Sequence, residues 1–338
     1  MKESYIYKQL ENNKVRCDTC SQRCIIAPEN FGICGVRKNI NGRLFALNYG
    51  KAISESIDPI EKKPLFHFLP GTHSLSVATV GCNFRCGNCQ NWQISQLVKI
   101  DKSMLEVGQN ISPEEIVENA VKNKCPSIAF TYTEPTIFLE YALDIMKLAK
   151  EKGIKNIWIT NGFMSSETLK MITPYLDAAN VDLKSFDDKF YKIYCGARVG
   201  PILENLKQIK KFGIWNEITT LIIPTLSDDE KMLGRIAKFI FKELGSETPW
   251  HVTAFSGAIS WKMQNVSDTS IEKIHKAYDI GKKAGLKYVY AGNIPGNSKE
   301  NTYCPKCNEL AIERIGFYIK RFDEKGKCGE CGECLDII

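Results

Sequence analysis

The sequence has no run of about 18 apolar residues, the least that a membrane-spanning helix needs. Its first residues, Met1 to Tyr5, lack the apolar stretch of a secretory signal peptide. We therefore expect a cytoplasmic protein that does not bind a membrane. The chain also lacks a strong charge excess, because 45 basic residues stand against 39 acidic ones and the basic residues are spread out. This mild net charge of +6 argues against a nucleic-acid partner.

Cysteine, by contrast, is abundant, with 14 in 338 residues. In a chain without an export signal, such cysteines are more typical of metal ligands than of disulfides. Cys125 and Cys195 stand alone, and we interpret each as a small buried hydrophobic residue. The other cysteines form three groups: an N-terminal set of Cys17, Cys20, Cys24 and Cys34, a central set of Cys82, Cys86 and Cys89, and a tail set of Cys304, Cys307, Cys328, Cys331 and Cys334.

The central set has the spacing C-x3-C-x2-C and follows the apolar run 75–80, which predicts a buried strand. Three thiolates on one loop can hold three irons of a 4Fe–4S cluster. Because no fourth cysteine lies near in sequence, the fourth iron would be open to a substrate or cofactor. A zinc site is the alternative, and it would need a fourth ligand from elsewhere in the fold.

Residues 73–295 alternate between apolar strand patterns and helix patterns. Strands are predicted at 74–80, 127–132, 156–160, 179–184, 216–223 and 250–255, with one more at 288–293. Helices are predicted at 112–124, 136–152, 165–176, 199–212, 228–244 and 269–284. This alternation predicts an α/β fold with parallel strands and right-handed crossovers. Six units fit a partial (β/α)6 barrel better than a closed barrel of eight.

Polar residues lie where several of these strands end, and barrel enzymes place their chemistry at the carboxyl ends of strands. Glu134 follows the second strand, Asp182 and Lys184 belong to the fourth, and His251 belongs to the sixth. Lys184 could pair with a ligand carboxylate, and Asp182 or Glu134 with an ammonium or hydroxyl group. An internal ion pair is the alternative for Lys184.

The ends of the chain are predicted to be small metal-stabilised modules. Residues 1–50 hold the N-terminal set at C-x2-C-x3-C-x9-C and a short hairpin with Asn41-Gly42 as its turn. Zinc and a second Fe–S cluster are both compatible with these four cysteines. Residues 51–72 contain two prolines and are expected to be an irregular connector, with His67 as a packing residue.

The tail, residues 296–338, carries two C-x2-C knuckles, which is the spacing of a zinc ribbon. Cys304 and Cys307 form the first knuckle, and Cys328 and Cys331 form the second. Structural zinc is therefore favoured. Cys334 is a fifth candidate, because C-x2-C-x2-C from Cys328 also resembles part of a ferredoxin run.

The C-x3-C-x2-C motif on a loop after a strand resembles the radical S-adenosylmethionine (SAM) superfamily. The resemblance implies that SAM binds the open iron, and that one-electron reduction cleaves it to a 5′-deoxyadenosyl radical, which takes a hydrogen atom from a substrate. It also implies an electron donor such as ferredoxin or flavodoxin, and an anaerobic or well-reduced setting. Members usually carry an aromatic residue before the third cysteine, where this chain has Asn88.

The resemblance extends to pyruvate formate-lyase activating enzymes, through Asp182-Leu183-Lys184, Trp250-His251 and the segment 222–229. It implies SAM contacts from Glu134, Asp182, Lys184 and His251. Through the segment 17–92 the sequence is most similar to the radical SAM enzymes of the AmmeMemoRadiSam system.

Two roles are open within this enzyme class, namely activation of a glycyl-radical enzyme and direct modification of a small molecule or peptide. Activating enzymes often carry extra clusters just after the central cysteines, whereas residues 90–111 here contain no cysteine. Outside enzymes, the alternative is a metal-stabilised nucleic-acid-binding module. The mixed charges of the tail, Lys320 and Arg321 with Glu330 and Glu333, argue against it.

Overall fold

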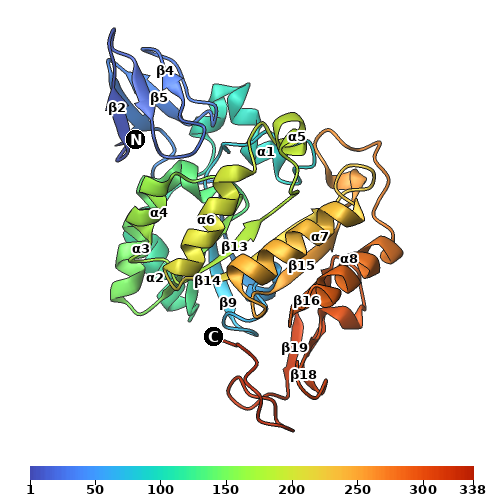
Figure 1. The fold of residues 1–338 in the computed structure, drawn as a ribbon. Coiled ribbons are helices and arrows are strands. Elements are labelled where there is room, and N and C mark those ends of the chain that lie inside the picture. Colours follow the sequence, from blue (N-terminus) through green and yellow to red (C-terminus); the bar gives the residue numbers. More distant parts are fainter.

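The structure, a computed structural model, describes residues 1–338 and is built around one eight-stranded sheet (Figure 1). The strand order is β16-β15-β14-β13-β12-β11-β9-β8. All neighbours are parallel except β8, which runs antiparallel to β9. The strands are β8 (Ser54–Pro59), β9 (His73–Ala78), β11 (Ser127–Phe130), β12 (Lys155–Thr160), β13 (Ala178–Asp182), β14 (Trp215–Ile222), β15 (Trp250–Ala254) and β16 (Val289–Gly292).

Helices connect the parallel strands and lie along the outside of the curved sheet. They are α1 (Trp92–Ser95), α2 (Pro113–Lys122), α3 (Leu139–Glu151), α4 (Ser166–Ile172), α5 (Asp188–Phe190), α6 (Gly200–Lys211), α7 (Glu230–Phe239) and α8 (Ile271–Lys283). Local sequence sets their starts: Ser112 and Glu115 form a capping box at α2, and Ser165, Asp229 and Ser270 cap α4, α7 and α8.

The predicted partial barrel is confirmed, including the additional strand at its end, β16. The connector prediction is wrong in one respect, because residues 54–59 form a regular strand at the edge of the sheet. The prolines do not prevent this, since Pro59 is the last residue of β8 and Pro64 lies beyond it. Buried Asp58 holds the strand in place by accepting hydrogen bonds from Lys62, Lys63 and Ser76.

The N-terminal module consists of two three-stranded sheets, at the blue end of the chain in Figure 1. Its strands are β1 (Lys2–Glu3), β2 (Tyr7–Gln9), β3 (Val15–Cys17), β4 (Ile25–Ile26), β5 (Arg37–Ile40) and β6 (Arg43–Ala46), and the short pair β7 (Lys51–Ala52) and β10 (Gln109–Asn110) follows it. The predicted hairpin is confirmed, with Ile40 opposite Arg43 across the Asn41-Gly42 turn. Both turn residues have positive φ, which an Asn-Gly turn supplies readily.

The tail forms a third three-stranded sheet at the opposite end of the molecule, with strands β17 (Thr302–Tyr303), β18 (Leu310–Ile315) and β19 (Tyr318–Arg321) (Figure 1). It is joined to the connector through completely buried His67, whose Nδ1 lies 3.1 Å from the Leu335 carbonyl oxygen. The guanidinium of Arg314 donates to the carbonyl of Phe66. None of the helices combines the length and hydrophobicity needed to cross a bilayer.

Candidate active site and metal centres

A cavity of about 640 Å³ occupies the interior of the partial barrel. This is within the usual size of a small-molecule site. Its walls include the central set of cysteines together with the four polar residues predicted from the strand ends: Cys82, Cys86, Cys89, Glu134, Asp182, Lys184 and His251. Tertiary structure thus brings all seven residues to one cavity.

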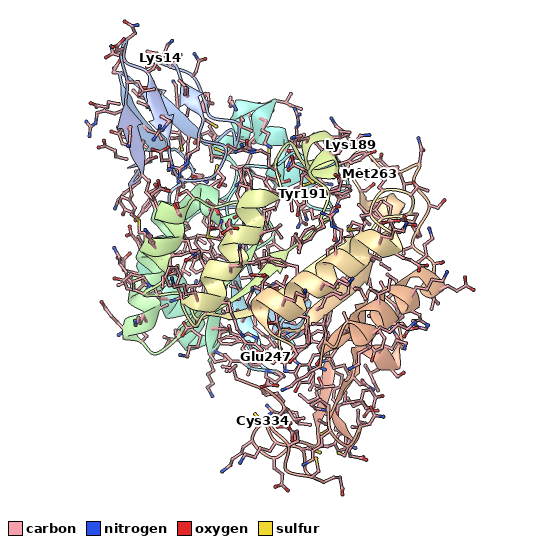
Figure 2. The ribbon with its side chains drawn as sticks, in the orientation of Figure 1. Lys14, Lys189, Tyr191, Glu247, Met263 and Cys334 are labelled. Carbon is pink, nitrogen blue, oxygen red and sulfur yellow. The ribbon has the colours of Figure 1, made fainter.

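The central cysteines lie on the loop after β9, which neighbouring segments hold in a fixed shape. The amides of Arg85 and Gly87 donate to the carbonyls of Cys195 and Tyr194, and the amide of Lys262 donates to the carbonyl of Gly87. A side chain at Gly87 would meet Met263, which is labelled in Figure 2. The loop therefore presents its cysteines from a backbone that many hydrogen bonds constrain.

The three central sulfurs do not all lie within 4.8 Å of one another. Two sulfurs on one zinc ion can be at most about 4.6 Å apart, because each Zn–S bond is about 2.3 Å. The spacing therefore fits a multinuclear cluster better than a single ion. Burial raises the pKa of the Cys82 and Cys89 thiols, so their thiolates need a bound cation to be stable.

Asp182 and Lys184 form an ion pair of 2.7 Å at the carboxyl end of β13. The Lys184 side chain is 14% exposed and that of Asp182 is 38% exposed. Burial lowers the pKa of Lys184, but the charges of Asp182 and Cys86 outweigh it and raise the pKa well above its usual value. Lys184 therefore stays positively charged in the cavity wall. It also forms an internal ion pair, which was the alternative to ligand binding in the sequence analysis.

Glu134 also lies at the predicted place, but its carboxylate already has several partners. Oε1 accepts from the hydroxyls of Thr136 and Thr160, and Oε2 accepts from the amide of Asn161 at 2.8 Å. Burial raises the pKa of this carboxyl. In the structure Glu134 joins the loops after β11 and β12, and its contact with SAM stays a prediction.

His251 is not at the carboxyl end of its strand, which corrects the prediction. It is the second residue of β15, and its Nε2 lies 2.7 Å from Glu217 Oε2. Glu217 also accepts from the amides of Phe66 and His67. Burial raises the pKa of Glu217, but the hydrogen bond and charge of His251 lower it to about 2. The strand pattern could not show this pairing, because the partner lies 34 residues away.

Two acidic residues in the cavity lining, Glu61 and Glu300, were not predicted. Glu61 is 5% exposed, and its Oε2 has no hydrogen-bond partner. Burial raises the pKa of Glu300 to about 7, with the charge of Arg314 opposing the shift. Neither residue directly follows a strand that the sequence predicted, since β8 before Glu61 was taken for an irregular connector, so the criterion used to find site residues could not select them.

Comparison with known proteins identifies the family. A family model described as the radical SAM superfamily matches residues 76–240. Uncharacterized protein MJ0808 of Methanocaldococcus jannaschii is 46% identical over 341 residues, covering 100% of both chains. The chain belongs to the radical SAM superfamily.

Two further comparisons give a relative in sequence and a solved structure with a similar fold. The pyruvate formate-lyase-activating enzyme of Clostridium pasteurianum is 26% identical over 166 residues, 47% of this chain and 66% of that protein. Streptococcus suis SuiB, solved bound to S-adenosylmethionine, superposes with a TM-score of 0.51 and 13% identity, covering 69% of this chain and 53% of that one. The second comparison shows a shared fold.

Membership of the radical SAM superfamily implies a 4Fe–4S cluster and SAM as cofactors, and the residues present fit both. Three thiols on one loop, Cys86 buried and Cys82 and Cys89 partly exposed, provide the ligands for three irons. Lys99, whose ammonium donates to the carbonyl of Phe84, places a cation beside the loop. Asn88, which stands where relatives usually have an aromatic residue, has a buried Oδ1 without a partner. It leaves an acceptor in the cavity wall that a bound ligand could use.

The tail of this radical SAM chain carries four cysteines that could hold a metal ion. The sulfurs of Cys304, Cys307, Cys328 and Cys331 all lie within 4.8 Å of one another, which fits one tetrahedral ion. Burial raises the pKa of Cys304, but the amides of Cys307 and Lys306 lower it to about 7. Cys334 is exposed and lies outside the group, at the bottom of the view in Figure 2.

Replacing Cys304 and Cys307 with serine is expected to remove one zinc ion per chain and to unfold the tail. The physical reason is that the tail's own apolar cluster is small: Cys304, Ala311, Cys328 and Leu335. Metal analysis and limited proteolysis of the purified protein measure both effects. Cys334→Ser is the matched control and should keep its zinc. Iron with acid-labile sulfide in the tail would contradict the assignment to zinc.

Proposed function

We propose that the protein binds SAM in the barrel cavity beside the central cysteines. It uses SAM to abstract a hydrogen atom from a substrate held in the same cavity. The observation that supports this most is that the central cysteines, the Asp182–Lys184 pair and Glu134 line one cavity. We assign Cys82, Cys86 and Cys89 as the cluster ligands. A reduced cluster of this kind, with SAM bound, supplies a 5′-deoxyadenosyl radical.

The protein's own residues would position SAM and exclude water. Lys184 has the charge to hold the SAM carboxylate, and Asp182 can accept a hydrogen bond from its ammonium or ribose hydroxyls. Phe84, on the cysteine loop, lines the cavity and packs against buried Phe163 with ring centroids 5.3 Å apart. An apolar side chain here would help to keep solvent from a reactive radical.

We propose an activating-enzyme-like role, in which the substrate is a glycine-bearing segment of a partner protein. The pyruvate formate-lyase-activating enzyme among the relatives supports this reading. The second candidate is a small polar molecule. It is favoured by two residues of the cavity lining, because the Glu61 carboxylate oxygen without a partner and the half-buried Glu300 offer acceptors to a ligand.

The test is anaerobic incubation of the reconstituted enzyme with SAM and a reductant, followed by mass spectrometry of 5′-deoxyadenosine. Cell extract is divided by ultrafiltration, and each fraction is added separately. Stimulation by the protein fraction with a new glycyl-radical EPR signal supports the activating role. Stimulation by the filtrate alone supports a small molecule and refutes that role. No 5′-deoxyadenosine under any condition would overturn the proposed function.

Lys184→Ala is expected to weaken SAM binding about tenfold to a hundredfold. The change removes a charge-assisted hydrogen bond worth about 1.5–3 kcal/mol. Iron content should stay normal, because Lys184 is not a proposed cluster ligand. Anaerobic calorimetric titration with SAM measures the affinity.

Lys192→Ala is the matched control for this variant, because Lys192 forms a comparable ion pair with Asp188 on the protein surface. It should bind SAM as the wild type does. If Lys184→Ala also binds SAM with wild-type affinity, Lys184 serves only its ion pair with Asp182.

A further inference from the structure

The four N-terminal cysteines surround a second cavity, separate from the barrel interior. Cys17, Cys20, Cys24 and Cys34 all line it, together with Arg37 and Asn83 among others. Its volume is about 10 Å³, against about 640 Å³ for the barrel interior, so the lining residues close tightly around it. These cysteines come from β3 and the loops around β4, so the folded module gathers them from a span of 18 positions, 17–34.

The sulfurs of this set are too far apart for a single ion as they stand. No three of them lie within 4.8 Å of one another, whereas the four sulfurs of the tail do. On one zinc ion every pair of sulfurs would be at most about 4.6 Å apart. Four cysteines whose sulfurs are farther apart than this fit an Fe–S cluster, which is held by four thiolates.

Two buried N–H donors beside the same cavity have no acceptor. Arg37 is 1% exposed, and its two terminal nitrogens are occupied by Glu140 and Ser4, while Nε has no partner. Asn83 is also 1% exposed, and its Nδ2 has no partner. Leaving such groups unpaired in the protein interior destabilises the folded state. The sulfur atoms of a cluster are acceptors that would satisfy both.

This cavity lies directly beside the central cysteine loop. Asn83, which lines it, follows Cys82 in the chain, and Gln22 donates to the Asn83 carbonyl at 3.0 Å. A side chain at Gly81 would lie 2.9 Å from the carbonyl oxygen of Cys34. The two cysteine sets are therefore separated by little more than one layer of residues.

Lys99 connects the two loops. Its Cγ lies 3.3 Å from the position of a β-carbon on Gly35, next to Cys34. Its ammonium donates to the carbonyl of Phe84 between Cys82 and Cys86. Lys99 is half-buried, and its charge lies between two groups of sulfur ligands. A cation in this place would stabilise negative charge on both.

We infer that the N-terminal set holds a second 4Fe–4S cluster, which passes electrons to the central cluster. The N-terminal cluster accepts one electron from a protein donor of the ferredoxin or flavodoxin class. That electron then moves to the central cluster, and the N-terminal cluster returns to its oxidised form. The transfer step rests on the proposed function, whereas occupancy of the site does not.

The test uses full-length protein in which Cys82, Cys86 and Cys89 are alanine, reconstituted anaerobically with iron and sulfide. The N-terminal module is unchanged in this variant, so loss of its fold cannot explain the result. We expect about four irons and four acid-labile sulfides per chain, and a reduced EPR signal that SAM does not alter. Zinc or no metal at the N-terminal set, with sulfide near zero, would overturn the inference. The sulfide assay distinguishes an N-terminal cluster from an iron ion bound by the tail cysteines, because a single ion carries no acid-labile sulfide.

A second measurement tests electron contact between the two sites. Fully reduced wild-type protein should show EPR broadening from magnetic interaction of two clusters, absent from the alanine variant and from Cys17→Ser/Cys20→Ser. Two unperturbed signals in the wild type would overturn the transfer step. If sulfide is present in the alanine variant but wild-type protein never cleaves SAM, the proposed function fails and the site stands.

Discussion

Replacing Cys82, Cys86 and Cys89 together with alanine is expected to reduce SAM cleavage to background. The three thiolates come from one loop, and the structure shows no set of cysteines that could replace all of them at the barrel cavity. Without these ligands the cluster is lost and SAM cannot be reduced. Anaerobic assay of 5′-deoxyadenosine and EPR of the reduced protein with and without SAM measure the effect.

Two cysteine variants serve as controls for this result. Cys125→Ala removes another buried thiol away from the cavity walls and should retain normal iron content and SAM cleavage. Cys195→Ala is more informative, because the Cys195 side chain contacts Cys86. The sequence interpretation of Cys195 as a small buried residue predicts that its loss leaves the cluster in place. A SAM-sensitive EPR signal in the triple variant would refute the assignment of the cluster ligands.

Glu140→Ala is expected to lower the free energy of unfolding by about 3–5 kcal/mol, because it leaves the buried guanidinium of Arg37 without a counter-ion. The two side chains form a double hydrogen bond of 2.9 and 2.7 Å with exposures of 2% and 0%. Glu140 also accepts from the amide of Tyr5, so it joins the N-terminal module to α3. Anaerobic denaturant unfolding measures the loss.

The exposed pair of Lys155 and Asp177 provides the matched comparison for this ion pair. Lys155 is 52% exposed, and Lys155→Ala should change stability by no more than about 1 kcal/mol. The double change Arg37→Met and Glu140→Leu should recover much of the stability lost in Glu140→Ala, because it removes both buried charges. A loss below about 1 kcal/mol in Glu140→Ala would show that the pair contributes little.

The barrel could be predicted from sequence because its evidence is local. Apolar runs and helix caps such as Ser112 act over a few residues, and the structure places strands and helices close to the predicted ranges. The prediction for the connector was wrong because it, too, used only local signals. Its prolines are strong local signals, but pairing of β8 with β9 is decided by contacts such as that between Asp58 and Ser76.

The sequence alone determined the chemistry for which the chain is equipped, because ligand spacing within one loop or knuckle is a property of consecutive residues. The C-x3-C-x2-C motif and the paired knuckles of the tail are of this kind. Only the tertiary structure decided which sulfurs lie close enough to share one ion, that His251 pairs with Glu217, and that the N-terminal set lies beside the central loop. Each of these depends on packing between segments far apart in the chain, which local patterns of hydrophobicity and spacing do not record.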